Sequence, residues 1–102
     1  MSNTTYQQLI ERAALTALDL HKATARKKSL KAELHAMYET FFKAHGRPEG
    51  HFHEDNEEFL PVMLFTDNQF QRVKAAKQAE YNAKRRHETA IRALAAHSKE
   101  AV

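Results

Sequence analysis

Histidines and carboxylates, side chains that can bind metal ions, gather in one short stretch of this sequence. His45, His51 and His53 are followed directly by Glu54 and Asp55. In an extended backbone, His51 and His53 could both reach one ion, with a carboxylate as a third ligand. The chain has no cysteine to close such a site, and short histidine-rich tracts are only compositional hints. We therefore favour a solvated loop without metal and keep a metal site at His51 and His53 as the minor alternative.

Basic side chains form a second candidate for chemistry. They occur in two groups: Lys22, Arg26, Lys27, Lys28 and Lys31, and Lys84, Arg85 and Arg86. Clustered cations can bind nucleic-acid phosphates by releasing counterions, dock on an acidic protein surface, or simply solvate a helix. Aromatic residues do not interleave with these cations, which disfavours stacking on single strands. No helix-turn-helix, zinc-finger or basic-zipper pattern is present.

The third candidate is an almost wholly apolar segment, residues 59–65, which reads FLPVMLF. Our preferred interpretation is a cap that packs on one end of a helical pair and contacts Phe41 and Phe42. The alternative is an exposed anchor for a partner protein, through Phe59, Leu60, Val62 and Met63.

Catalytic motifs are absent from the sequence. There is no order of residues typical of a serine or cysteine nucleophile, no phosphate-binding glycine loop and no HExxH motif. A chain of 102 residues is also short for a core with a substrate domain. We expect no enzymatic activity and no cofactor.

The elements that position these residues begin with a long helix. Thr4 and Thr5 each stand three residues before a glutamine, which gives a capping box in two registers. No glycine or proline interrupts the chain until Gly46 and Pro48, a left-handed cap followed by a residue that cannot continue a helix. The first helix is predicted over residues 5–45.

A second helix is predicted over residues 67–97. Thr66 to Gln69 form another capping box, and Phe65 and Phe70 could form a hydrophobic staple around it. Pro61 disfavours helix at the preceding residue, so the whole connection, residues 46–66, is expected to be irregular.

Apolar periodicity predicts which faces are buried. In the first helix, steps of three and four residues connect Tyr6, Leu9, Ala13, Thr16, Leu20, Ala23, Lys27, Leu30, Leu34, Met37 and Phe41, a coiled-coil-like stripe. The second helix is patchier, with Phe70, Val73, Tyr81, Ile91, Leu94 and Ala95. If residue 45 is level with residue 67, Phe70 faces Phe42 and Ile91 lies near Leu20. The sequence thus predicts a single all-α domain, residues 1–102, folded as an antiparallel hairpin.

This register has two consequences. Tyr6, Leu9, Ile10 and Ala13 would extend beyond the second helix as an apolar overhang, which a partner protein or a homodimeric four-helix bundle would cover. The eight basic residues named above would share one level, a basic belt formed by residues 22–31 and 84–86.

These features favour a protein that acts by binding. No apolar run is long enough to span a membrane, no signal peptide is apparent, and we expect a cytoplasmic location. Helical proteins of this type are common among accessory proteins of phages and mobile elements. By that analogy we expect a regulator or inhibitor that docks on a larger protein machine, such as host nucleic-acid-processing machinery. The residues expected to contact the partner are Tyr6, Leu9, Ile10, Phe59, Leu60, Val62 and Met63. The alternatives are sequence-independent nucleic-acid binding by the basic belt and a structural homodimer.

Overall fold

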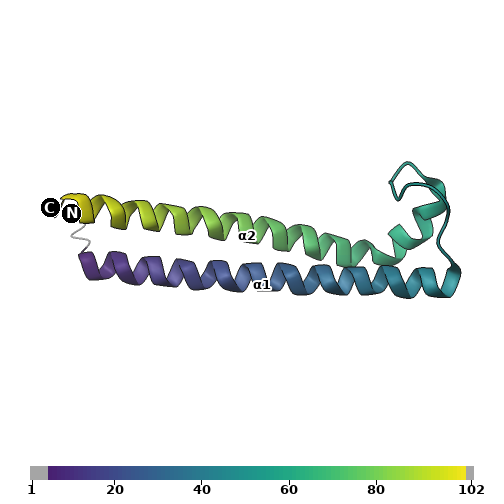
Figure 1. The fold of residues 1–102 in the computed structure, drawn as a ribbon, viewed down its shortest axis with the longest axis horizontal. Coiled ribbons are helices and arrows are strands. Elements are labelled where there is room, and N and C mark those ends of the chain that lie inside the picture. Colours follow the sequence, from purple (N-terminus) through teal and green to yellow (C-terminus); the bar gives the residue numbers. More distant parts are fainter. Residues whose placement is uncertain (1–4, 101–102) are drawn as a thin grey trace.

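The protein is an antiparallel hairpin of two long helices (Figure 1). The computed structural model describes the backbone of residues 5–100 and the side chains of residues 5–98. Helix α1 spans Tyr6–His45, and helix α2 spans Leu60–Glu100 after a short 3-10 helix, η1, at Glu57–Phe59. The molecule measures 64 × 22 × 21 Å. The predicted all-α hairpin is confirmed.

Helix α1 begins at the predicted capping box. The Gln8 backbone N–H donates to the Thr5 hydroxyl at 3.2 Å, and the Thr5 N–H donates to the Gln8 side chain at 2.8 Å. These bonds satisfy groups that lack a partner inside the helix. The alternative register at Thr4 lies outside the described residues.

Gly46 ends α1, but not in the predicted left-handed conformation. Its N–H donates to the Phe42 carbonyl oxygen at 2.7 Å, with φ 80° and ψ 157°. This region of backbone space is accessible almost only to glycine. The chain therefore leaves the helix in an extended direction and turns back over the end of α1.

Helix α2 begins at Leu60 rather than at residue 67, so the predicted irregular connection 46–66 is wrong in its second half. Pro61 lies in the first turn, where its missing N–H would have no partner inside the helix anyway. Thr66 is not a cap but a buried residue inside the helix, whose hydroxyl donates to the Val62 carbonyl oxygen at 2.8 Å. Such back-bonding often bends helices, and α2 bends in this region (Figure 1).

The buried stripe of α1 agrees with the prediction. Every predicted position from Leu9 to Phe41 is buried or half-buried, whereas Tyr6 is exposed. The stripe includes two polar residues, Thr16 and Lys27, and both bond across to α2.

The buried stripe of α2 differs from the prediction. Starting from Phe59 in η1, steps of three and four connect the main buried and half-buried positions: Phe59, Val62, Thr66, Gln69, Val73, Ala76, Glu80, Ala83, His87, Ala90, Leu94 and His97. Met63 and Ala93, which are also half-buried, lie beside this stripe. The larger apolar residues expected there, Phe70, Tyr81 and Ile91, are 44%, 55% and 43% exposed. Val73 and Leu94 lie in the stripe as predicted. Small alanines allow α2 to approach α1 closely, and polar residues in the stripe find partners across the interface, so side-chain hydrophobicity alone misplaced the other predicted positions.

The register between the helices also differs. Thr16 was predicted level with residue 96, but it contacts His87 at 2.9 Å, nine residues earlier. That difference amounts to roughly 14 Å along the axis. Tyr6 stacks on His97 with ring centroids 5.5 Å apart, and Leu9 and Ala13 are buried. The predicted apolar overhang is therefore wrong, because α2 covers it.

Candidate binding surfaces

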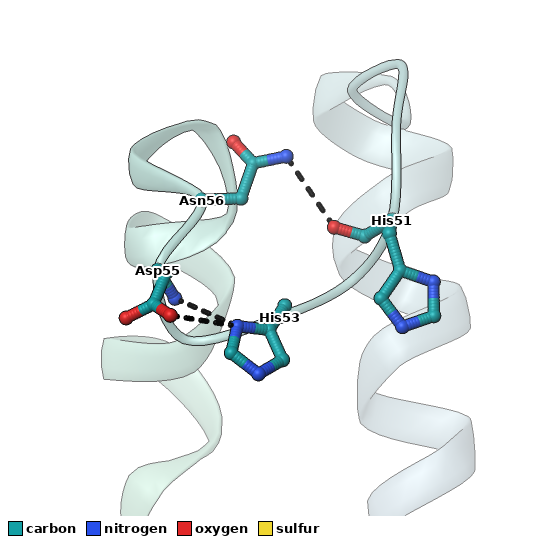
Figure 2. Close-up of polar contacts among 4 residues, drawn as sticks. All are labelled: His51, His53, Asp55 and Asn56. Atoms are coloured by element: carbon teal, nitrogen blue, oxygen red, sulfur yellow. Dashed lines mark hydrogen bonds and ion pairs between the residues drawn. The ribbon is translucent and has the colours of Figure 1, made fainter.

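The histidine loop is organised by short-range bonds within itself (Figure 2). His53 Nδ1 lies 3.4 Å from an Asp55 carboxylate oxygen and accepts a hydrogen bond from the Asp55 N–H at 3.2 Å. The Asn56 side chain donates to the His51 carbonyl oxygen at 3.3 Å. The rings of His51 and His53 are 6.4 Å apart. Within the described residues, no three His, Cys, Asp or Glu side chains come together as metal ligands, so this geometry supports a structured loop.

The loop is anchored to the hairpin by aromatic rings. Phe52, from the loop, lies 4.8 Å from Phe59 and 5.3 Å from Tyr38 of α1, measured between ring centroids. Phe59 is completely buried and also meets Phe42 edge-on at 6.3 Å. The guanidinium of Arg47 stands 5.2 Å from the Phe42 ring, an arrangement that favours a cation–π contact. This end of the molecule, which we call the loop end (residues 38–70), holds the largest group of aromatic side chains.

A groove of about 540 Å³ opens beside this aromatic group. Tyr38 and Phe52 line one part of it, and Met63 and Phe70 of α2 line another. Its polar lining includes Glu54, Asp67 and Lys74, with His53, Thr66 and Gln71. A concave site that combines aromatic and apolar side chains with charged groups is a candidate for ligand or peptide binding.

The structure separates the residues that we expected to bind a partner protein. Leu9, Phe59 and Val62 are buried in the hairpin. Tyr6 and Ile10 are exposed at the end of the molecule where α1 begins and α2 ends, whereas Leu60 and Met63 lie at the opposite, loop end (Figure 1). The seven residues therefore do not form one surface. Sequence reasoning missed Leu64, Phe65 and Phe70, whose exposed side chains are clear only once the buried face of α2 is known.

The basic belt is longer than predicted and contains more cations. Two cross-helix bonds lie near its ends: Thr16 with His87, and Gln69 Nε2 with the Leu30 carbonyl oxygen at 3.0 Å. We call residues 17–31 and 70–86 the basic shaft. All eight predicted belt residues lie in it, but Lys84, Arg85 and Arg86 are level with residues 17–19 rather than with 26–28. Three further cations that the predicted register missed also lie in the shaft: Arg72, Lys74 and Lys77.

One ion pair crosses the basic shaft. Lys27 Nζ lies 2.8 Å from a Glu80 carboxylate oxygen, and both side chains are about one quarter exposed. The hydrogen bond from Lys27, with a weaker one from Thr24, holds the pKa of Glu80 below its ordinary value. Lys84 adds a smaller electrostatic contribution that lowers the pKa of Glu80 further, so Glu80 offsets the charge of Lys27 and lies near a second cation of the shaft.

Charge is segregated along the molecule. Residues 46–60 hold five acidic side chains against one basic side chain, Arg47, for a net charge of −4. The basic shaft holds eleven basic side chains against two acidic ones, Asp19 and Glu80, for a net charge of +9. Charge patterning of this kind can orient a molecule toward partners of opposite charge.

No protein-family model, curated protein or solved structure matches this chain. Neither of the two long helices contains, in its described residues, a stretch long and apolar enough to cross a membrane. The functional argument therefore rests on the loop end and the basic shaft.

Proposed function

We propose that this protein is a non-enzymatic binding protein that regulates or inhibits a larger protein by docking on it with the loop end of the hairpin. The observation that carries the proposal is the groove lined by Tyr38, Met63 and the exposed Phe70, on an end of the molecule where Leu60 and Leu64 of α2 are also exposed. Contiguous apolar surface of this kind is often an interaction site.

The loop end has the rigidity that docking requires. Phe59 and Val62 are fully buried beneath the exposed residues, and Phe52 ties the loop to both helices. A surface that keeps its shape before binding loses less conformational entropy when a partner arrives.

The charge of the loop end favours one kind of partner surface. Glu54 and Asp67 line the groove, and the neighbouring loop adds Asp55, Glu57 and Glu58. A partner that presents a bulky apolar side chain flanked by basic groups fits this combination. Proteins that handle nucleic acid carry basic surfaces of that kind, which agrees with a target in nucleic-acid-processing machinery.

A homodimer is the alternative occupant of the apolar surface. Two hairpins packed side by side along their whole length would place one basic shaft against the other, because the shaft lies in the middle of the molecule. Like charges at close range cost energy, so charge disfavours the four-helix bundle. Sedimentation measures this directly, and a stable dimer that Phe70→Glu dissociates would favour the homodimer over our proposal.

The proposal is tested by partner capture from the native host, followed by binding measurements with the purified partner. We expect Leu64→Glu and Phe70→Glu to abolish capture, because both place a charge on the exposed apolar surface. Both positions are exposed, so the helical circular dichroism signal should remain.

Leu15→Glu is the matched control. Leu15 is 63% exposed but lies on α1 roughly 35 Å from Tyr38 along the helix axis. Capture should survive this change. If Phe70→Glu and Leu64→Glu hold the same partner as tightly as the unmodified protein does, the loop end is not the docking surface.

A further inference from the structure

A row of lysines continues from the groove along one side of the basic shaft. Seven residues in an α-helix are close to two full turns, so positions seven apart share a side. Lys77 and Lys84 stand seven and fourteen residues after Phe70, and Lys31 stands seven before Tyr38. Phe70 and Tyr38 both line the groove, and so does Lys74. Lys28 lies about one helical turn from Lys31. We call these five lysines the lysine row: Lys28, Lys31, Lys74, Lys77 and Lys84.

The lysine row has one acidic neighbour between its members, Glu80, which stands three residues after Lys77 and four before Lys84. All five lysines are exposed. Glu80 is paired with Lys27 at 2.8 Å, so its single charge is shared between that lysine and the nearby Lys84. Asp19 lies about a third of a turn away from this side of α1. Two further carboxylates stand at the ends of the row: Asp67 in the groove, and Glu88, which pairs with Arg92 at 3.7 Å.

The dimensions of the shaft match the backbone of a nucleic-acid duplex. Lys74 to Lys84 span roughly 15 Å of helix, and a duplex presents about nine phosphates over that length at one charge per ~1.7 Å. Lysine ammonium groups are flexible point charges that suit phosphate oxygens, and contacts to phosphates carry no sequence information.

Single strands suit this side of the molecule less well. Tyr81 is the one aromatic residue between Lys74 and Lys84, and it is exposed, although the sequence predicted it to be in the buried stripe. The guanidinium of Arg85 already stands 5.8 Å from its ring. Sequence-tolerant binding of single strands uses several aromatic rings on which successive bases stack.

We infer that the lysine row binds the phosphate backbone of double-stranded nucleic acid without sequence preference. This second site does not rest on the proposed docking function, because it has a different partner and shares only Lys74 with the groove. Five lysine–phosphate contacts would place the salt dependence of binding in a range that can be measured.

The test is fluorescence anisotropy of the full chain with a labelled 25-base-pair DNA duplex across a salt series. With five contacts, affinity should fall roughly 500-fold between 50 and 200 mM salt. In the triple variant Lys74→Gln, Lys77→Gln and Lys84→Gln, two contacts remain and the fall should be only about 12-fold. Glutamine and lysine have similar helix propensities, so the fold should be retained.

The matched control removes three cations from elsewhere: Arg12→Gln, Lys22→Gln and Lys43→Gln. Lys22 lies within the basic shaft but on the opposite side of α1 from Lys31 and Tyr38, and the net charge changes by the same amount. The control should keep the salt dependence of the unmodified protein. An equal loss in both triple variants would mean that net charge, and not the lysine row, attracts the duplex, and would overturn the inference.

Three other results would also overturn it. One is the absence of duplex binding at 50 mM salt. A second is tighter binding to the single strand of the same sequence. The third is competition by polyglutamate, at equal charge concentration, as strong as that of unlabelled duplex, which would point to an acidic protein as the partner.

Discussion

Replacement of Phe59 by alanine tests the most consequential local feature of the fold, the start of α2 at Leu60. In a helix that begins there, Phe59, Val62 and Thr66 share the buried side, while Leu64 faces solvent. An extended segment would distribute burial differently, because successive side chains of an extended chain alternate between two faces.

The expected loss follows from the surroundings of Phe59. Its side chain is completely buried between Phe42 and Phe52, so truncation removes apolar burial and leaves a cavity that the rigid aromatic neighbours fill poorly. Phenylalanine-to-alanine changes at such sites cost about 3–5 kcal/mol. A loss of 3 kcal/mol would lower the Tm of a domain of this size by roughly 12–24 °C.

The assay is urea denaturation followed by circular dichroism, with linear extrapolation of the free energy of unfolding. Phe59→Leu keeps part of the buried apolar area, so it should lose less stability than Phe59→Ala. It serves as the second variant if Phe59→Ala is too unstable to measure. The control is Leu64→Ala, at a side chain that is 69% exposed, for which we expect a change within about 0.5 kcal/mol. If Leu64→Ala costs as much as Phe59→Ala, the helical interpretation of this segment is refuted.

Three further predictions concern the helix interface and its ends. Ala83→Leu should destabilise the protein by about 1–3 kcal/mol, because the residue is buried where the helices meet; the exposed Ala79→Leu should change little, and equal effects in denaturation experiments would contradict the assigned face. Gly46→Ala should cost about 1–3 kcal/mol through backbone strain alone, since nothing lies within 4 Å of an added Cβ; an unchanged Tm would contradict the positive φ. The lowered pKa of Glu80 means that its pairing with Lys27 stabilises the protein above pH 4.5, and that this contribution is lost as the pH falls through the folded-state pKa. On acidification, the Tm of Glu80→Gln should therefore fall less than that of the unmodified protein. Parallel curves of Tm against pH for the two proteins would argue against the pair.

Much of α1 could be predicted from the sequence. Its capping box at Thr5, its end before Gly46 and its buried stripe from Leu9 to Phe41 all depend on local signals, namely a hydroxyl and an amide three residues apart, a glycine, and a regular apolar repeat. Each of these acts within a few residues of chain, so a single sequence suffices to find it.

The basic surface could be predicted only in part. The eight cations of the predicted belt do lie in the basic shaft. However, the predicted alignment of the α2 cations with those of α1 along the helix axis was wrong, and Lys74 and Lys77 were missed. The levels depend on how far one helix slides along the other, and several registers bring some apolar residues together. The apparent match of Phe70 with Phe42 was one such coincidence.

The sequence by itself determined that two long helices form and fold back on each other, because capping residues and apolar repeats are local properties. Only the tertiary structure decided which side of α2 is buried. Its interface uses small alanines and polar residues such as Gln69, Glu80 and His87, whose burial becomes favourable only when partners on α1 lie opposite. For the same reason, the groove and the lysine row could not be predicted from the sequence, because both depend on which side of α2 faces solvent.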